Sequence, residues 1–379
     1  MKKLLTIFSL ALLINSCKKI DHTAKAEVGS NKKSIQLDSI YSDLYKQNLF
    51  NGNVLIAENG NIIFNKSYGI ANKEKELDLN EGTIFELASV SKQFTAMAIV
   101  QLVKEGKLNY DDTISKFIPE LSFYNTITIE NLLYHTSGLP DYFNLADEYW
   151  DKSKIATNQD ILNLFAQQEP ELYFETSTDY EYSNTGYMIL ASIIEKVSGL
   201  AYGDYLKKSI FKPAKMENTF VYNRRYAPKK IENLAVGYIY SDSLQVTHLP
   251  DNMTDYDFVT YLDGIVGDGM VNSNVKDLYN WDRILRTEKL VNQSDKERIF
   301  QSLKFFDSIP TGYGYGWYIV EDVKFGKYVK HSGGWPGFVT HIERHLDSDK
   351  TIIVLQNIMT EQPTIPLKST RKILYNIPL

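Results

Sequence analysis

The stretch FELASVSKQFTAMAIV, residues 85–100, places two serines just before a lysine, where a polar-flanked segment becomes an almost wholly apolar run. Ser89 and Lys92 are three residues apart, so on a helix their side chains share one face, whereas Ser91 points elsewhere. The start of a helix favours developing negative charge, and a dry interior there disfavours the ammonium form of lysine. The stretch therefore predicts a central buried helix at whose start a hydroxyl and an amine can exchange a proton.

The spacing alone does not separate a nucleophile from an ordinary helix start. Ser89 could serve as an N-cap, and Lys92 could reach water along its aliphatic stem. The pattern Ser-x-x-Lys occurs six times, starting at Ser16, Ser30, Ser89, Ser209, Ser273 and Ser369. Both interpretations stay open until partner residues are considered.

The composition describes a large globular protein. The chain has 379 residues, of which 43% are hydrophobic and 23% charged, enough for one large domain or two small ones. The net charge is −6 and no basic block stands out, so no nucleic-acid partner is expected. None of the six histidines belongs to a His-Glu-x-x-His motif of the kind that zinc hydrolases use. We expect no metal and no other cofactor.

The N-terminus resembles a bacterial lipoprotein signal. Its apolar stretch, residues 4–14, is too short to span a bilayer, and Cys17, the only cysteine, follows the small residue Ser16. The resemblance implies a signal peptide at 1–16 and a lipidated N-terminus and tether at 17–33. The alternative is a secretory peptide cut nearby, with Cys17 incidental. We expect a mature chain in the bacterial envelope, bound to the membrane through its lipid and without an internal disulfide.

Strand and helix patterns lie at both ends of the chain. The predicted elements there are a helix at 34–48, a hairpin at 54–58 and 61–64, a second hairpin at 338–346 and 351–356, and a final helix at 366–375. The pair Asn59-Gly60 is a strong hairpin signal because both positions tolerate positive φ. We therefore predict one sheet lobe built from residues about 34–107 and 263–379.

The middle of the chain, about 108–262, shows mainly helical runs. Two of them cover 161–166 and 187–197, and Gly199 is the expected end of the second. The predicted fold is α+β, with an antiparallel sheet flanked by helices in a sandwich lobe and an inserted, mostly helical lobe. A cleft between the lobes is the expected ligand site.

Two further motifs contribute to a resemblance to a known family. They are Tyr-Ser-Asn at 182–184 and His-Ser-Gly-Gly at 331–334. With residues 89–92 they resemble, in order and context, the three motifs of the serine β-lactamase and penicillin-binding-protein superfamily, in particular its class C β-lactamase, D,D-peptidase and esterase branch. The segments ITIENLLYHTSGLP at 127–140 and GDGMV at 267–271 add to the likeness, which runs from about residue 34 to the C-terminus.

The resemblance implies catalytic roles for four residues. Ser89 is the expected nucleophile, and Lys92 with Tyr182 forms the expected proton-transfer pair. The ammonium charge is expected to lower the pKa of Tyr182 so that it acts first as a base and then as an acid. Asn184 is expected to hydrogen-bond Lys92 or the substrate amide. Core packing for Tyr182 and a helix cap for Asn184 remain as alternatives, but they leave the order of the motifs unexplained.

The resemblance of the third motif implies which residues bind the substrate. The backbone amides of Ser89 and Gly334 are expected to form the oxyanion hole, with Gly333 and His331 beside them. The β-lactamase branch usually carries lysine where this chain has His331, and a mostly neutral imidazole weakens the carboxylate anchor. Histidine here also resembles D-aminopeptidase and esterase-like members. Residues 174–178 lack the usual Pro-Gly, so specificity differs there as well.

Other hydrolase types fit less well. His135 is expected to shape a turn and not to act in catalysis. The motif Gly-x-Ser-x-Gly is absent from the sequence, which argues against an α/β-hydrolase. The predicted function is serine hydrolysis through acylation of Ser89 by a small peptide, ester or amide, with β-lactams and D-amino-acid substrates among the candidates. The alternative is a penicillin-binding or sensor-type envelope lipoprotein that is acylated with little turnover.

Overall fold

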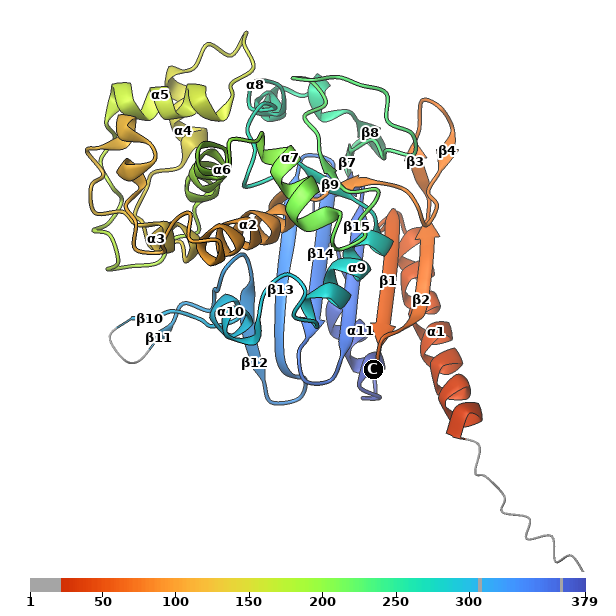
Figure 1. Ribbon diagram of the computed structural model, residues 1–379. Coiled ribbons are helices and arrows are strands. Elements are labelled where there is room, and N and C mark those ends of the chain that lie inside the picture. The colour runs from red at the N-terminus through yellow and green to blue at the C-terminus, as the bar shows by residue number, and fades with distance from the viewer. Residues whose placement is uncertain (1–21, 306–308, 362–363) are drawn as a thin grey trace, which may run out of the picture.

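A six-stranded antiparallel sheet forms the centre of the computed structural model, which describes residues 22–305, 309–361 and 364–379 (Figure 1). In sheet order its strands are β12 (Tyr318–Asp322), β13 (Gly326–Trp335), β14 (Phe338–His345), β15 (Lys350–Gln356), β1 (Gly52–Glu58) and β2 (Asn61–Tyr68). Strand β1 lies between β2 and β15, with Gly52 opposite Gln356. The two ends of the chain therefore build one sheet, as predicted.

Both predicted hairpins are confirmed. In the first, Asn59 and Gly60 have φ values of 51° and 73°, so both occupy the left-handed region that an Asn-Gly pair tolerates. In the second, β14 and β15 pair from Val339 opposite Gln356 to His345 opposite Lys350. The short β10 (Lys304–Phe305) and β11 (Ile309–Pro310) form a further hairpin outside the main sheet.

Helices cover both faces of the sheet (Figure 1). On β1, Val54 and Ile56 pack with helices α1 (His22–Lys46) and α11 (Leu367–Leu374), whereas Leu55 and Ala57 belong to the large core on the other face. This alternation follows from the two-residue period of a strand. On the second face, α9 (Val275–Leu285) packs on β15 and β1, and the 3₁₀ turn η1 (Ala88–Ser91) packs on β13 and β14 and leads into α2 (Lys92–Lys104).

The opening helix is longer than the sequence pattern predicts. It begins at His22, within the segment expected to be a tether, and continues past Ser34. Lys33 anchors it, because its Nζ bonds Glu58 Oε2 at 2.7 Å and the carbonyl of Leu374 at 2.9 Å. The predicted signal peptide and the lipidation site at Cys17 lie outside the described residues. No helix in the described part of the chain combines the length and apolarity that a membrane crossing needs.

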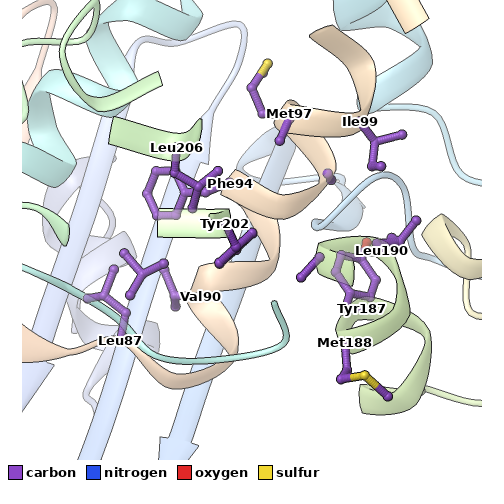
Figure 2. Close-up of a cluster of buried hydrophobic side chains, with 14 of the residues drawn as sticks. Leu87, Val90, Phe94, Met97, Ile99, Tyr187, Met188, Leu190, Tyr202 and Leu206 are labelled. Atoms are coloured by element: carbon purple, nitrogen blue, oxygen red, sulfur yellow. The ribbon is translucent and has the colours of Figure 1, made fainter. Parts of the chain in front are cut away.

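Helix α2 is central and buried, as predicted. Figure 2 shows Phe94 near Tyr202 of helix α7 (Tyr202–Leu206), and Ile99 on the side of α2 toward Leu190 of helix α6 (Asn184–Ser198). The side chain of Lys92, at the first position of α2, is also fully buried. A lysine in such surroundings has to be paired or used.

The inserted region is mostly helical. Its helices are α3 (Ile129–Leu133), α4 (Tyr142–Tyr149), α5 (Asn158–Gln168), α6, α7 and α8 (Phe258–Tyr261), and α10 (Gln293–Ile299) follows later. The end of α6 at Gly199, with φ of 70°, is confirmed. The region also contains three short strands that periodicity did not predict: β6 (Phe220–Val221), β7 (Tyr238–Ser241) and β8 (Val246–His248).

Two of these short strands return to the sheet lobe. Strand β7 pairs with β16 (Ile358–Met359), and β6 pairs with β9 (Val271–Ser273). Strand β9 also pairs with β5 (Phe85–Glu86), directly before Ser89. The α+β architecture with its inserted helical lobe is thus confirmed, and the segment around 220–248 adds strands at the lobe boundary.

Candidate active site

Ser89 lies in η1, at the point where the chain enters α2. The amide of Leu87 donates to the carbonyl of Val271 at 2.8 Å, and Thr340 Oγ1 donates to the carbonyl of Leu87 at 2.7 Å. Ala88 has φ of 49°, a left-handed conformation that is costly for a residue with a Cβ. The backbone before Ser89 is therefore held in a strained turn by strands β9 and β14.

The amine of Lys92 connects three parts of the site. Its Nζ donates to Ser89 Oγ at 3.2 Å, to Asn184 Oδ1 at 2.9 Å and to the carbonyl of Asp268 at 2.9 Å. Burial lowers the pKa of Lys92 to about 8, although the carboxylates of Asp268 and Asp141 act in the opposite direction. The amine can therefore exchange protons near neutral pH. The contact with Asn184 is the one that the resemblance implied.

Tyr182 reaches the same place from the segment before α6. Its ring centroid lies 4.9 Å from Lys92 Nζ. Its hydroxyl is buried and has no hydrogen-bond partner at normal distance among the described residues. Burial raises the pKa of Tyr182 above its usual range, against a lowering effect of the Ser89 hydroxyl, and the Asp268 charge raises it further. The prediction of a lowered pKa is therefore wrong, because desolvation of the phenolate outweighs the favourable contacts.

His135 lies in a left-handed turn with φ of 59°, where the sequence placed a turn. It is fully buried, and its ring centroid is 4.4 Å from that of Tyr182. Its Nδ1 accepts a hydrogen bond from the amide of Ser183 at 3.0 Å, and its carbonyl accepts one from the amide of Glu181 at 3.1 Å. His135 thus holds both chain neighbours of Tyr182.

His331 is a buried neutral imidazole. Its Nδ1 is 2.7 Å from the carbonyl of Ser332 and its Nε2 is 3.0 Å from the hydroxyl of Tyr313. These partners assign the proton to Nδ1 and make Nε2 the acceptor. Burial lowers the pKa of His331 to about 3, with the Lys92 charge acting in the same direction. The expected neutrality is confirmed, but His331 does not line the cavity at Ser89, where the sequence placed it as a ligand contact.

The two glycines of the third motif differ in their surroundings. A Cβ on Gly333 would lie 2.2 Å from the carbonyl of Leu87 and 2.4 Å from Thr340 Oγ1, whereas one on Gly334 would meet nothing within 4 Å. Gly333 therefore permits the close packing of β13 against the turn that carries Ser89. The substrate contact predicted for Gly333 stays a prediction. Gly334 lines the same cavity as Ser89, and its place in an oxyanion hole stays a prediction.

A cavity of about 70 Å³ opens beside Ser89, lined by residues of both lobes. Its lining consists of Glu86, Ala88, Ser89, Tyr142, Phe143, Asn184, Leu262, Ile265, Asp268, Gly269, Met270, Gly334 and Trp335. A cavity is therefore present between the lobes, where the sequence analysis predicts a ligand site.

Sequence reasoning assigned no role to three of these residues, Glu86, Asp268 and Tyr142. Glu86 and Asp268 stood within quoted motifs, and the hydrogen bond from Tyr142 Oη to Asp268 Oδ2 at 3.0 Å had no sequence signal. In the described part of the chain no group of three or more His, Cys, Asp or Glu residues is arranged to hold a metal ion.

Comparisons with known proteins show which family the chain resembles. The model of the family described as Beta-lactamase matches residues 37–375. Penicillin-binding protein 4* of Bacillus subtilis (strain 168) is 41% identical over 350 residues, which cover 92% of this chain and 77% of that protein.

Solved structures agree with this placement. The octameric penicillin-binding protein homologue from Pyrococcus abyssi aligns with a TM-score of 0.74 and 28% identity over 89% of this chain and 76% of its own. The D-amino acid amidase from Ochrobactrum anthropi SV3 shares the fold, with a TM-score of 0.74 and 22% identity over 91% of this chain and 99% of its own. These likenesses support serine hydrolase activity, and the match over residues 37–375 shows that the chain belongs to the Beta-lactamase family.

Proposed function

We propose that the chain is a serine hydrolase that acts through an acyl-enzyme at Ser89 on small peptide, ester or amide substrates. The observation that carries this proposal is the fully buried amine of Lys92, 3.2 Å from Ser89 Oγ. Because burial lowers its pKa to about 8, a fraction of the amine is neutral at physiological pH and can accept the serine proton.

In acylation, Ser89 Oγ would bond to the substrate carbonyl carbon while its proton passes to the neutral amine of Lys92. The backbone amides of Ser89 and Gly334 are the candidates for stabilising the oxyanion. The bond to the leaving group then breaks, and the leaving amine or alcohol takes a proton from the Tyr182 phenol, which Lys92 replaces. Water attacks the ester, releases the acid and restores the Ser89 hydroxyl.

Tyr182 fits the role of proton donor better than that of first base. Its raised pKa keeps the phenol protonated at neutral pH, whereas Lys92 titrates close to that range. The Lys92 amine lies 4.9 Å from the centroid of the Tyr182 ring, so the phenol and the amine are neighbours in the site.

The test is hydrolysis of a nitrophenyl acyl ester by Ser89→Ala, with Ser91→Ala as matched control. Ser91 is the neighbouring serine, but its Oγ accepts from the amide of Val271 at 3.1 Å instead of contacting Lys92. We expect hydrolysis and labelling by a fluorescent phosphonate to be lost in Ser89→Ala and kept in Ser91→Ala. Full ester hydrolysis by Ser89→Ala, or probe attachment at another residue, would refute the proposal.

A penicillin-binding protein that is acylated with little turnover is the second candidate. The name of the Bacillus subtilis relative, at 41% identity, favours it. Intact-mass measurement after exposure to penicillin separates the two: a hydrolase loses its adduct, whereas an acylated binding protein keeps it for hours.

The envelope location is a separate proposal that is supported by sequence alone. Cys17 follows an apolar stretch and the small residue Ser16, which suits lipid attachment to its sulfur. Expression in a bacterial host with an alkynyl fatty acid should label the wild-type chain and leave Cys17→Ser unlabelled. Equal labelling of the two would contradict this proposal and leave the Ser89 chemistry unaffected.

A further inference from the structure

Glu86 is a buried carboxylate without a partner, three residues before Ser89. Only 9% of the residue is exposed, and it lines the cavity that contains Ser89. Within the described part of the chain no hydrogen bond or ion pair joins the Glu86 carboxylate to another residue, and burial raises its pKa to about 7. A buried carboxylate usually has a partner, because leaving it unpaired costs free energy.

The arginines behind Glu86 do not supply that partner. Arg224 and Arg225 act on Glu86 only through their charges, and Asp263 acts in the opposite direction. Both guanidinium groups are paired elsewhere: Arg224 bonds Asp251, and Arg225 bonds Asp251 at 2.7 Å and Asp263 at 2.9 Å. The charges of the two arginines are balanced by those of the two aspartates. The negative charge of the Glu86 carboxylate therefore has no compensating cation on this side of the cavity.

The cavity walls suit a cation. Among the lining residues none is lysine, arginine or histidine, and the two carboxylates are Glu86 and Asp268. The other polar or aromatic walls include Tyr142, Phe143 and Trp335, and the rings of Phe143 and Trp335 lie 6.3 Å apart. Aromatic faces next to carboxylates attract an ammonium group through cation–π interactions and direct hydrogen bonds.

The two basic side chains near Ser89, Lys92 and His331, cannot bind a substrate carboxylate. The three protons of the Lys92 ammonium are directed at Ser89, Asn184 and the carbonyl of Asp268. His331 is neutral, and both of its ring nitrogens are engaged by protein groups. The site therefore lacks an anchor for an anion close to Ser89.

We infer that the substrate carries a protonated amino group next to the scissile carbonyl, as in an α-aminoacyl amide or ester, and that Glu86 and Asp268 bind this ammonium. The inference rests on the proposed Ser89 chemistry. The ammonium takes no part in bond making: Ser89 Oγ bonds to the carbonyl carbon, the amide or ester bond breaks, and water releases the free amino acid. A cavity of about 70 Å³ suits a compact ammonium better than an extended acyl chain.

The experiment compares alanine 4-nitroanilide, as both enantiomers, with its N-acetylated form on the full-length protein. For the wild type we expect kcat/KM to favour the free amine by about tenfold or more in at least one enantiomer. Glu86→Gln and Asp268→Asn should each lower this preference by about tenfold, mainly through KM. Glu81→Gln is the matched control, because Glu81 is an exposed carboxylate outside the cavity.

Phosphonate labelling at Ser89 distinguishes a failure of the ammonium-site inference from a failure of the proposed hydrolase function. If wild-type Ser89 is labelled but the acetylated anilide is hydrolysed as well as the free amine, the ammonium site is refuted while the proposed hydrolase stands. If the preference survives in both Glu86→Gln and Asp268→Asn, these carboxylates are not its source and the inference fails. If wild-type Ser89 is not labelled, the proposed function itself fails. A circular dichroism spectrum and a urea unfolding transition like those of the wild type show that each variant is folded.

Discussion

The imidazole Nδ1 of His135 accepts a hydrogen bond from the backbone amide of Ser183 at 3.0 Å, on one side of Tyr182. On the other side, the amide of Glu181 donates to the carbonyl of His135 at 3.1 Å. The two bonds flank Tyr182, and the His135 ring packs against its ring. His135 is therefore a positioning residue for Tyr182, and among the described residues no hydrogen bond joins its imidazole to Ser89 or to a carboxylate.

Replacing His135 should impair proton transfer more than substrate binding. In His135→Leu the Ser183 amide loses its acceptor, so we expect the free energy of unfolding to fall by about 1–3 kcal/mol. Because Tyr182 is then less well placed, kcat should fall by about tenfold or more while KM changes little. Steady-state kinetics and urea denaturation check both values.

The control for this prediction is His248→Leu on strand β8, which removes a half-buried histidine that is not part of the candidate site. It should keep kcat. A His135→Leu protein with lowered stability but wild-type kcat would show that His135 supports the fold only.

The activity should rise with pH as Lys92 loses its proton. Burial lowers the pKa of Lys92 to about 8, so kcat/KM should increase with pH and level off above about pH 8. Lys92→Arg should lower kcat/KM by about 10²–10⁴-fold, because a guanidinium stays protonated and cannot accept the serine proton. A pH–rate profile for the wild type and the variant checks this. A flat profile between about pH 6 and pH 9 would exclude Lys92 as the base.

Much of the site could be predicted because its signals are local. The three-residue spacing of Ser89 and Lys92 determines which serine faces the amine, and the structure has this contact. The turn at Asn59-Gly60 and the end of α6 at Gly199 also follow from backbone preferences of single residues.

The remaining features depend on distant contacts. The carbonyl that receives Lys92 belongs to Asp268, 176 residues away, and no pattern in the sequence joins the two. The pKa of Tyr182 depends on burial, which the fold decides, so a rule based on nearby charge predicted the wrong direction. The packing of Gly333 on Leu87 likewise exists only once β13 and η1 are in place.

Three buried histidines should make the fold sensitive to acid. Burial lowers the pKa of His331 to about 3 and holds those of His135 and His341 below their usual value. Below about pH 6.5 these histidines become protonated in the unfolded chain but stay neutral in the folded chain. The stability that they contribute is therefore complete above about pH 6.5 and is lost as the pH falls toward their folded pKa values. At pH 5 the buried neutral imidazole of His331 alone costs about 2 kcal/mol.

The share of His331 can be isolated with His331→Gln, which keeps groups able to bond Tyr313 and the carbonyl of Ser332. The fall in unfolding free energy from pH 7 to pH 5 should shrink by about 2 kcal/mol relative to the wild type. Between pH 7 and pH 8, above the histidine transition at about pH 6.5, the unfolding free energies of the two proteins should change with pH by the same amount. Equal acid sensitivity of the two proteins would mean that His331 is protonated in the folded state.

The paired substitutions Gly333→Ala and Gly334→Ala test the different roles of these adjacent glycines. At Gly333 the new Cβ would lie 2.2 Å from the carbonyl of Leu87, so β13 or the turn before Ser89 has to shift. We expect a loss of about 1–3 kcal/mol in unfolding free energy and slower phosphonate labelling of Ser89. At Gly334 nothing lies within 4 Å of the new Cβ, so the stability should change by less than about 0.5 kcal/mol. Thermal and urea denaturation of the two variants measures the difference, and equal stability would mean that β13 does not press against η1 in solution.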